Sequence, residues 1–353
     1  CRATALTEYP MPENPRFPAE WEPQSAILMA WPHAGTDWAD RLSATSTCFA
    51  EICTAICARQ PLLLLVPDQD IERNARKSLQ AAGCRFEYLH FIRLPYDDTW
   101  LRDSGPITLR DGAGFLLLDF HFTAWGGKFE AGLDDRIVAG LLQSGVFREV
   151  RYQRIDFALE GGGIETDGRG TLLSTWHCLH ARHPDLSRAE IETILMNKLH
   201  QDRVLWLEHG YLEGDDTDAH IDTLARFASA DTIVYQGCRD PDDPHFTDLQ
   251  AMAAELHRLQ QTDGRPYRLH ELPWPKPVLD GGRRLAASYA NFLIINGAVL
   301  MPVYGDAADA SAMTVMQSAF PGREVVGIPC RDLIWQNGSL HCCTMQLPEG
   351  LLK

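Results

Sequence analysis

The stretch Tyr289-Ala-Asn-Phe-Leu-Ile-Ile-Asn-Gly-Ala-Val-Leu-Met-Pro-Val303 decides the fold class. Two apolar runs, Tyr289–Ile295 and Ala298–Val303, flank Asn296-Gly297, and an Asn-Gly link between such runs is the strongest short-range signal for a β-hairpin. A helical pattern follows at Asp309–Phe320, where apolar residues recur at spacings of three and four. The sequence therefore predicts a unit made of a strand pair and a helix.

Similar units are predicted along the rest of the chain, with a period of roughly 55 to 70 residues. Helical patterns recur at Leu186–Leu199 and Phe246–Leu259. No long linker or low-complexity segment separates the units, which favours one α/β domain spanning residues 1–353, with about five units around an axis. The other predicted strand pairs are Pro106–Leu109 with Gly114–Phe120, Leu159–Glu165 with Gly170–Thr175, His220–Phe227 with Thr232–Gln236, and Leu340–Leu347 with Ala26–Trp31.

Composition narrows the function class. The chain has 353 residues, of which 45% are hydrophobic and 23% are charged, with a formal net charge of −16. This acidity argues against nucleic acid as a partner and suits a cationic ligand. The absence of a charged start with an apolar run, and of any apolar run of membrane-spanning length, predicts a cytoplasmic protein without membrane contact. The ten scattered cysteines do not resemble a disulfide framework, and Cys53 and Cys57 are expected to pack as small hydrophobes.

Polar residues recur at corresponding places in the predicted units. His220 and Asp222 stand two residues apart, and in a strand this spacing puts both side chains on one face. If the units surround an axis, the polar residues at the starts of strand pairs converge on a central site. The residues concerned are Asp103, Glu160, His220, Asp222, Asn291 and Cys342.

The chemistry of these residues suits attack on a cationic substrate. Cys342 is a candidate nucleophile, since a nearby cation or histidine makes a thiolate available near neutral pH. His220 could give a proton to a leaving group and then take one from water. Asp103 and Asp222 could each accept paired hydrogen bonds from a planar guanidinium, and Glu160 could hold the histidine or share the cation.

Other kinds of site are less well supported. A metal site could use His177, Cys178, His180 and His183, or His341, Cys342 and Cys343, but these spacings fit no standard zinc pattern. A cysteine protease would share the chemistry, although several carboxylates favour a cation over a neutral peptide carbonyl. No glycine-rich loop with a phosphate-binding lysine follows a strand. The run Glu160–Gly163 indicates a close backbone approach beside a ligand or a bulge.

At these residues the chain resembles the agmatine deiminase and Porphyromonas-type peptidylarginine deiminase family, within the guanidine-modifying (pentein) superfamily. The resemblance implies a five-bladed, pseudo-symmetric α/β propeller that hydrolyses a guanidine to a ureido group and ammonia without metal or cofactor. It makes Cys342 the nucleophile, His220 the acid and base, Asp103 and Asp222 the guanidinium clamp, and Glu160 a supporting carboxylate. It rests on Phe17–Pro23, Trp31–His33, Asp98–Pro106, Ala124–Lys128, Glu160–Gly162, Gly214–Asp218 and His341-Cys342.

The resemblance also suggests which residues bind the rest of the substrate. Its candidates are Asn291 beside the reacting groups and, for the outer pocket, Asp97, Asp98, Trp100 and Trp125. The chain departs from the family pattern at Trp335–Ser339, at Ala219 and at Trp176–His183. These departures do not change the reacting residues. They fall in segments expected to line the pocket around the part of the substrate that is attached to the guanidine.

The favoured function is therefore hydrolysis of agmatine to N-carbamoylputrescine and ammonia through a covalent thiouronium on Cys342. The first alternative is a peptidylarginine deiminase that converts protein arginine to citrulline. The second is a catalytically silent propeller that binds polyamines or a protein. The sequence leaves open whether the chain forms a homo-oligomer.

Overall fold

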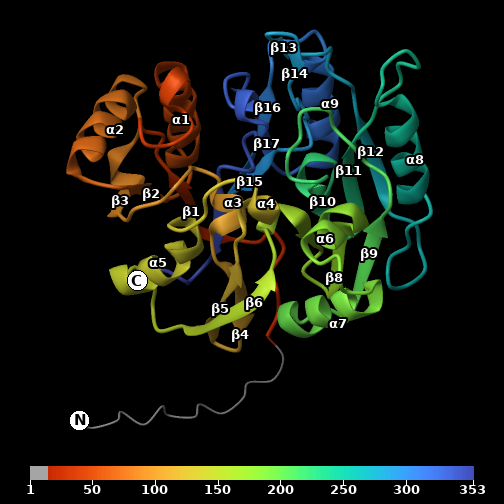
Figure 1. Ribbon diagram of the computed structural model, residues 1–353, viewed down its shortest axis with the longest axis horizontal. Helices are drawn as coiled ribbons and strands as arrows, with labels where there is room; N and C mark the ends of the chain where they lie inside the picture. Colours follow the sequence, from red (N-terminus) through yellow and green to blue (C-terminus); the bar gives the residue numbers. More distant parts are fainter. Residues whose placement is uncertain (1–14) are drawn as a thin grey trace.

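The computed structural model describes residues 15–353. Within this range the strands form five sheets of three or four strands and one two-stranded ribbon, with helices around them (Figure 1). Each of the five sheets contains an antiparallel strand pair, and a further strand runs parallel to one member of that pair. The last strand of the chain pairs with the first, at the edge of the four-stranded sheet.

The sheets follow one another along the chain, except that the last strand, β18, closes the first sheet. In spatial order their strands are β18 (Met345–Pro348), β1 (Gln24–Ala30), β2 (Leu62–Val66) and β3 (Leu89–Arg93); β4 (Ile107–Asp111), β5 (Gly114–His121) and β6 (Arg151–Ala158); β7 (Ile164–Thr166), β8 (Thr171–Thr175) and β9 (Arg203–Leu207); β10 (Ala225–Ser229), β11 (Thr232–Gln236) and β12 (Arg268–Leu272); and β15 (Leu293–Ile295), β16 (Ala298–Val303) and β17 (Glu324–Pro329). The ribbon pairs β13 (Leu279–Asp280) with β14 (Arg283–Arg284).

Helices connect the parallel strands, because two parallel neighbours need a crossover that spans the length of a strand. The helix α7 begins with a capping box in which Ser187 and Glu190 each bond the other's main-chain N–H. The helices are α1 (Leu42–Cys57), α2 (Gln69–Ala81), α3 (Leu101–Ser104), α4 (Ala124–Gly127), α5 (Ile137–Ser144), α6 (Trp176–Arg182), α7 (Arg188–Leu199), α8 (Phe246–Leu256) and α9 (Asp309–Ala319).

The predicted strand pairs are present, but β7, β10, β15 and β18 each begin four or five residues later than the apolar runs suggest. Asn296-Gly297 links β15 to β16, and the positive φ of 77° at Gly297 is the conformation that this turn requires. Residues 289–292 form a turn at 289–290 and irregular chain at 291–292 before β15, and Gly161–Gly163 form a 3-10 turn before β7. The C-terminal strand pairs with β1 as predicted, so that Leu28 lies opposite Met345.

The prediction that His220 and Asp222 lie in a strand is wrong. Strand β10 begins only at Ala225, and Ile221–Thr223 form a 3-10 turn. The carboxylate of Asp215 accepts hydrogen bonds from the main-chain N–H groups of Thr217 and Ala219, which tightens the turn before His220. Asp218 and Ala219 adopt positive φ angles of 65° and 69°, so the chain cannot be extended there.

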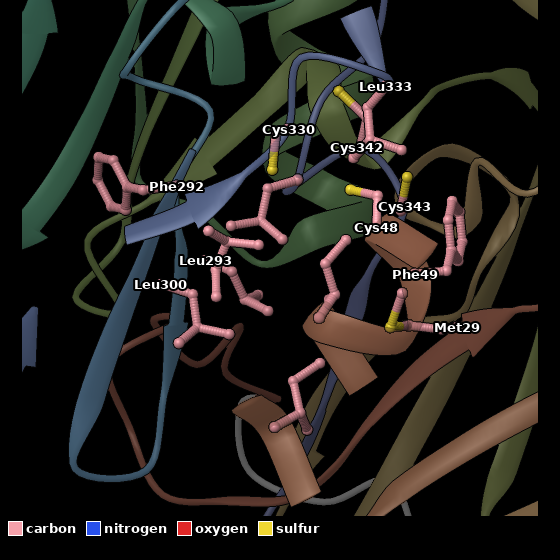
Figure 2. Close-up of a cluster of buried hydrophobic side chains, with 14 of the residues drawn as sticks. Met29, Cys48, Phe49, Phe292, Leu293, Leu300, Cys330, Leu333, Cys342 and Cys343 are labelled. Carbon is pink, nitrogen blue, oxygen red and sulfur yellow. The ribbon is translucent and has the colours of Figure 1, made fainter. Parts of the chain in front are cut away.

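The buried apolar core reaches the C-terminal turn that carries the two adjacent cysteines. Cys343 is fully buried in a cluster with Cys48, Phe49, Cys330 and Leu333 (Figure 2). Cys48 donates a hydrogen bond through its thiol to the carbonyl oxygen of Pro329 at 3.1 Å. This packing holds the turn from one side, and Cys342 lies on the same turn.

The other cysteines of the described residues are also buried and carry free thiols. Cys53 and Cys57 lie inside the core on α1, which confirms that they pack as small hydrophobes. Cys1 lies outside the described residues. Among residues 15–353, no helix is both long and apolar enough to cross a bilayer.

Candidate active site

Six of the side chains singled out by the sequence meet in one place. They lie at the turns before β4, β7, β10, β15 and β18, so each of the five sheets supplies at least one of them. None is more than 5% exposed. The convergence predicted from the repeated units is therefore present for Asp103, Glu160, His220, Asp222, Asn291 and Cys342.

Cys342 is held between a carboxylate and an amide. Its Sγ lies 3.7 Å from Asp222 Oδ2, and Asn291 Nδ2 donates a hydrogen bond to the sulfur at 3.2 Å. Burial, together with the carboxylates of Asp222 and Asp103, raises the pKa of the Cys342 thiol well above its ordinary value. The free protein therefore holds a protonated thiol, and a cation bound beside it would favour the thiolate.

His220 lies between two carboxylates. Its Nδ1 is 3.8 Å from Asp103 Oδ1, and its Nε2 is 3.6 Å from Glu160 Oε2. Burial opposes a charged ring, but Asp103 and Glu160 raise the pKa of His220 well above its ordinary value. The ring is therefore an imidazolium that can give a proton to a leaving group.

The glycine run at 161–163 lets the backbone pass against these groups. A Cβ on Gly162 would lie 2.6 Å from His220 Nδ1 and 2.8 Å from Asp103 Oδ1. The main-chain N–H of Gly162 donates a hydrogen bond of 2.9 Å to Asp103 Oδ1. The close backbone approach predicted from the sequence is confirmed, and here it orients one of the carboxylates.

Asp222 is fixed from behind by a buried ionic network that the sequence analysis missed. His341 Nδ1 lies 2.8 Å from Asp222 Oδ2, and its Nε2 lies 2.8 Å from Glu20 Oε2. Glu20 pairs in turn with Arg226 at 2.5 Å, and Arg226 also binds Glu165. Burial raises the pKa of Asp222, but the hydrogen bond from His341 and the neighbouring cations hold it below its ordinary value.

Replacing His341 with glutamine is expected to move the acidic limb of the pH profile of kcat/KM to higher pH and to steepen it, because Asp222 then loses its charge closer to the range in which Asp103 does. Without the hydrogen bond from His341, the pKa of Asp222 rises, and activity that needs its carboxylate is lost sooner as the pH falls. The measurement is kcat/KM across the acidic range for both proteins. Glu20→Gln is the control, because it keeps the bond to Asp222. Superimposable profiles would mean that His341 only supports the fold.

Glu160 is held by a second buried partner that the sequence analysis missed. Arg182, on α6, donates hydrogen bonds to Glu160 Oε1 at 2.7 Å and to Asp218 Oδ2 at 2.6 Å. Lys128 bonds the same Asp218 oxygen at 2.7 Å. Burial opposes the charge of Glu160, yet His220 and Arg182 hold its pKa below the ordinary value. The only sequence signal for Arg182 was its place in Trp176–His183, where the chain departs from the family pattern.

Cys342 and Asp103 line a cavity of about 650 Å³. All four residues predicted for the outer pocket line it, and Trp125 Nε1 donates a hydrogen bond of 3.0 Å to Asp103 Oδ2. Asn291 is not in the lining and lies against the thiol instead. The lining consists of Gly35, Asp37, Asp97, Asp98, Trp100, Asp103, Trp125, Phe129, Glu130, Asp134, Asp216, Thr217, Arg283, Trp335, Gln336, Asn337, Gly338 and Cys342.

The lining of this cavity is strongly acidic. Among the described residues, Arg283 is its one lysine or arginine, set against seven aspartate and glutamate residues. Burial raises the pKa of Asp98 to about 8 and that of Asp134 to about 7. Burial also raises the pKa of Asp103 to about 6. Burial therefore keeps these carboxyl groups partly protonated near neutral pH. A bound cation would lower their pKa values, and the ionised carboxylates would then stabilise the cation.

The two histidine and cysteine groups weighed as metal sites do not assemble among residues 15–353. His183 bonds the carbonyl oxygen of Ala158, and the ring of His180 stacks on Trp176. Cys178 alone of its group points toward the site and contacts His220. In the second group His341 is paired with two carboxylates, and Cys343 faces the apolar core.

Known proteins resemble this chain over almost its whole length. The family model for Porphyromonas-type peptidyl-arginine deiminase matches residues 16–348. The chain belongs to this family. Agmatine deiminase from Stutzerimonas stutzeri is 34% identical over an alignment that covers 99% of this chain and 100% of the relative.

Solved structures of family members share the fold over almost the whole chain. An enzyme from Porphyromonas gingivalis, provisionally assigned as an arginine deiminase, is 47% identical with a TM-score of 0.88, covering 96% of this chain and 100% of that one. C. jejuni agmatine deiminase with substrate bound is 34% identical with a TM-score of 0.87, covering 96% of this chain and 97% of that one. The α/β fold is therefore that of the family.

Proposed function

We propose that the protein hydrolyses agmatine to N-carbamoylputrescine and ammonia. The acidic cavity above Cys342 is the observation that carries this proposal. Agmatine has a guanidinium at one end and a primary ammonium at the other, so both ends are cations. Relatives named agmatine deiminase cover the whole chain and support the same substrate.

The guanidinium would bind between Asp103 and Asp222, with Cys342 beside its central carbon. Its positive charge would favour loss of the thiol proton to solvent, and the thiolate would form a C–S bond to that carbon. The His220 imidazolium would donate a proton through Nδ1, which faces Asp103, as the C–N bond breaks and ammonia leaves. A covalent thiouronium would remain on the sulfur.

The second half of the reaction would use the same groups in reverse. Neutral His220 would take a proton from water, and the resulting hydroxide would attack the thiouronium carbon. The C–S bond would break and the proton of the new hydroxyl group would pass to solvent, which releases the neutral ureido product and restores the thiolate and the imidazolium. Glu160 would support His220 throughout, and Asn291 would hold the sulfur in line. No step in this sequence calls for a metal or a cofactor.

The carboxylates also bear on the choice between agmatine and peptidylarginine. In protein arginine the guanidine is attached to neutral peptide groups, which give the acidic wall no positive charge to bind. Desolvating carboxylates against a neutral group costs free energy without compensation. We therefore rank peptidylarginine second, and free arginine is disfavoured by its α-carboxylate.

We further propose that the five sheets are the blades of a pseudo-symmetric propeller, and that residues 1–353 form one domain. The repeated order of antiparallel pair and parallel third strand supports this arrangement. A cytoplasmic location stays a prediction, and so does the absence of nucleic acid as a partner.

The test is release of ammonia and ureido product from agmatine, free arginine and a blocked arginine peptide. We expect kcat/KM to be at least about 100-fold higher for agmatine than for the peptide. The peptide has no ammonium group, so its complex lacks the ion pair between that group and the carboxylates of the cavity. Faster turnover of the peptide would move the function to protein modification. Binding of agmatine without any turnover would favour the silent polyamine-binding propeller.

A further inference from the structure

Three possible metal ligands meet at His220, and none of the three residues lines the cavity. They are Cys178 on α6, Glu160 after β6, and His220 before β10. One donor atom from each lies within 4.8 Å of the donor atoms of the other two, and all three residues are buried. The cluster shares two residues with the candidate active site, while Cys178 has no part in the proposed reaction.

The ring nitrogen Nε2 of His220 faces this cluster, with Glu160 Oε2 at 3.6 Å. Among the described residues this nitrogen has no hydrogen-bond partner, although the ring is only 1% exposed. A Cβ on Gly163 would lie 3.5 Å from Cys178 Sγ and 3.9 Å from His220 Nε2. The glycine therefore leaves the space beside the thiol and the nitrogen free of a side chain.

Groups outside the cluster would hold its ligands in place. Asp103 Oδ1 lies 3.8 Å from the other ring nitrogen, Nδ1, and a small approach would give the hydrogen bond that carboxylates form with histidines that bind zinc. Arg182 bonds Glu160 Oε1 at 2.7 Å and leaves Oε2 directed at the cluster. Thiolate, imidazole and carboxylate are the ligands that zinc prefers, and the two anions balance its charge.

The geometry points to an inhibitory zinc site formed by Cys178 Sγ, His220 Nε2 and Glu160 Oε2. Binding displaces the thiol proton of Cys178 and the Nε2 proton of His220 to solvent. The metal then occupies the nitrogen that must be protonated for the ring to be an imidazolium. His220 can no longer donate a proton to the leaving group, so zinc stops turnover. The inhibition, but not the binding, rests on the proposed function.

Cobalt(II) is the probe for binding, because a thiolate ligand gives it an intense charge-transfer band in the near ultraviolet. The full chain is titrated with cobalt chloride in a phosphine reductant. We expect the band in the wild-type protein, in Cys342→Ala and in Cys238→Ala. It should be absent from Cys178→Ala and from Cys178→Ser, which keeps the size of the side chain if alanine prevents folding.

Zinc inhibition of agmatine turnover is the second measurement. Each variant is compared with its own rate without zinc, and reversal by a chelator is checked. We expect Cys178→Ser to need at least roughly tenfold more zinc for half inhibition. A wild-type protein without the cobalt band, or a band that survives Cys178→Ser and disappears in Cys342→Ala, would overturn the site. A Cys178-dependent band in a protein without agmatine turnover would support the site and reject the proposed function.

Discussion

Replacing Cys342 with alanine is expected to lower kcat for agmatine by on the order of 10⁴-fold or more. The substitution removes the atom that forms the covalent bond, and no other thiol of the described residues lines the cavity. Single-turnover and steady-state rates of ammonia release measure the effect. Trapping with acid should recover a mass adduct on the wild-type protein and none on the variant.

Cys343→Ala is the matched control for this prediction. Cys343 adjoins the nucleophile in sequence but faces Cys48 and Leu333 in the core. Its loss should reduce stability, with kcat changed by no more than about threefold. A Cys342→Ala protein that kept more than about a tenth of wild-type kcat would rule out the covalent mechanism.

Replacing His220 with glutamine is expected to lower kcat by roughly 10²- to 10⁴-fold, the usual effect of removing a general acid and base. Glutamine keeps much of the size and polarity of the ring, but it cannot carry and release a proton. The loss should fall mainly on kcat, because the guanidinium contacts of Asp103 and Asp222 remain. The measurement is the separate determination of kcat and KM with agmatine.

His209→Gln is the matched control for His220→Gln. His209 also lies beside a carboxylate, Glu255, at 2.6 Å, but its side chain is 47% exposed and does not line the cavity. It should keep wild-type kcat. A His220→Gln protein whose KM rose while kcat stayed constant would show that the ring binds substrate and transfers no proton.

The sequence predicted the strand pairs well because their signals are local. Asn296-Gly297 encodes its turn in two residues, and the apolar runs on either side need no distant contact to be recognised. The sequence predicted the ends of the strands less well. An apolar run at 289–292 reads as strand, but in the structure it is a buried turn that places Asn291 against the thiol.

The sequence placed the reacting residues together through their positions in the repeated units, not through correct local structure. The strand argument for His220 and Asp222 was wrong, because Asp215 and the positive φ angles at 218 and 219 bend the chain there. The partners behind the site were missed altogether. Glu20 and Arg226 are 206 positions apart, and a single sequence contains no signal that pairs such distant charges.

The order in which the reacting groups appear along the chain has a consequence for biosynthesis. Each of the five sheets contributes to the site, and Cys342 leaves the ribosome after Asp103, Glu160, His220 and Asp222. Strand β18, directly after Cys342, must pair with β1 across more than 300 residues of chain. Such long-range pairing is slow, so the first sheet is completed late. A nascent or C-terminally truncated chain would display the carboxylates without the sulfur, and reactivity would begin only when β18 had paired with β1.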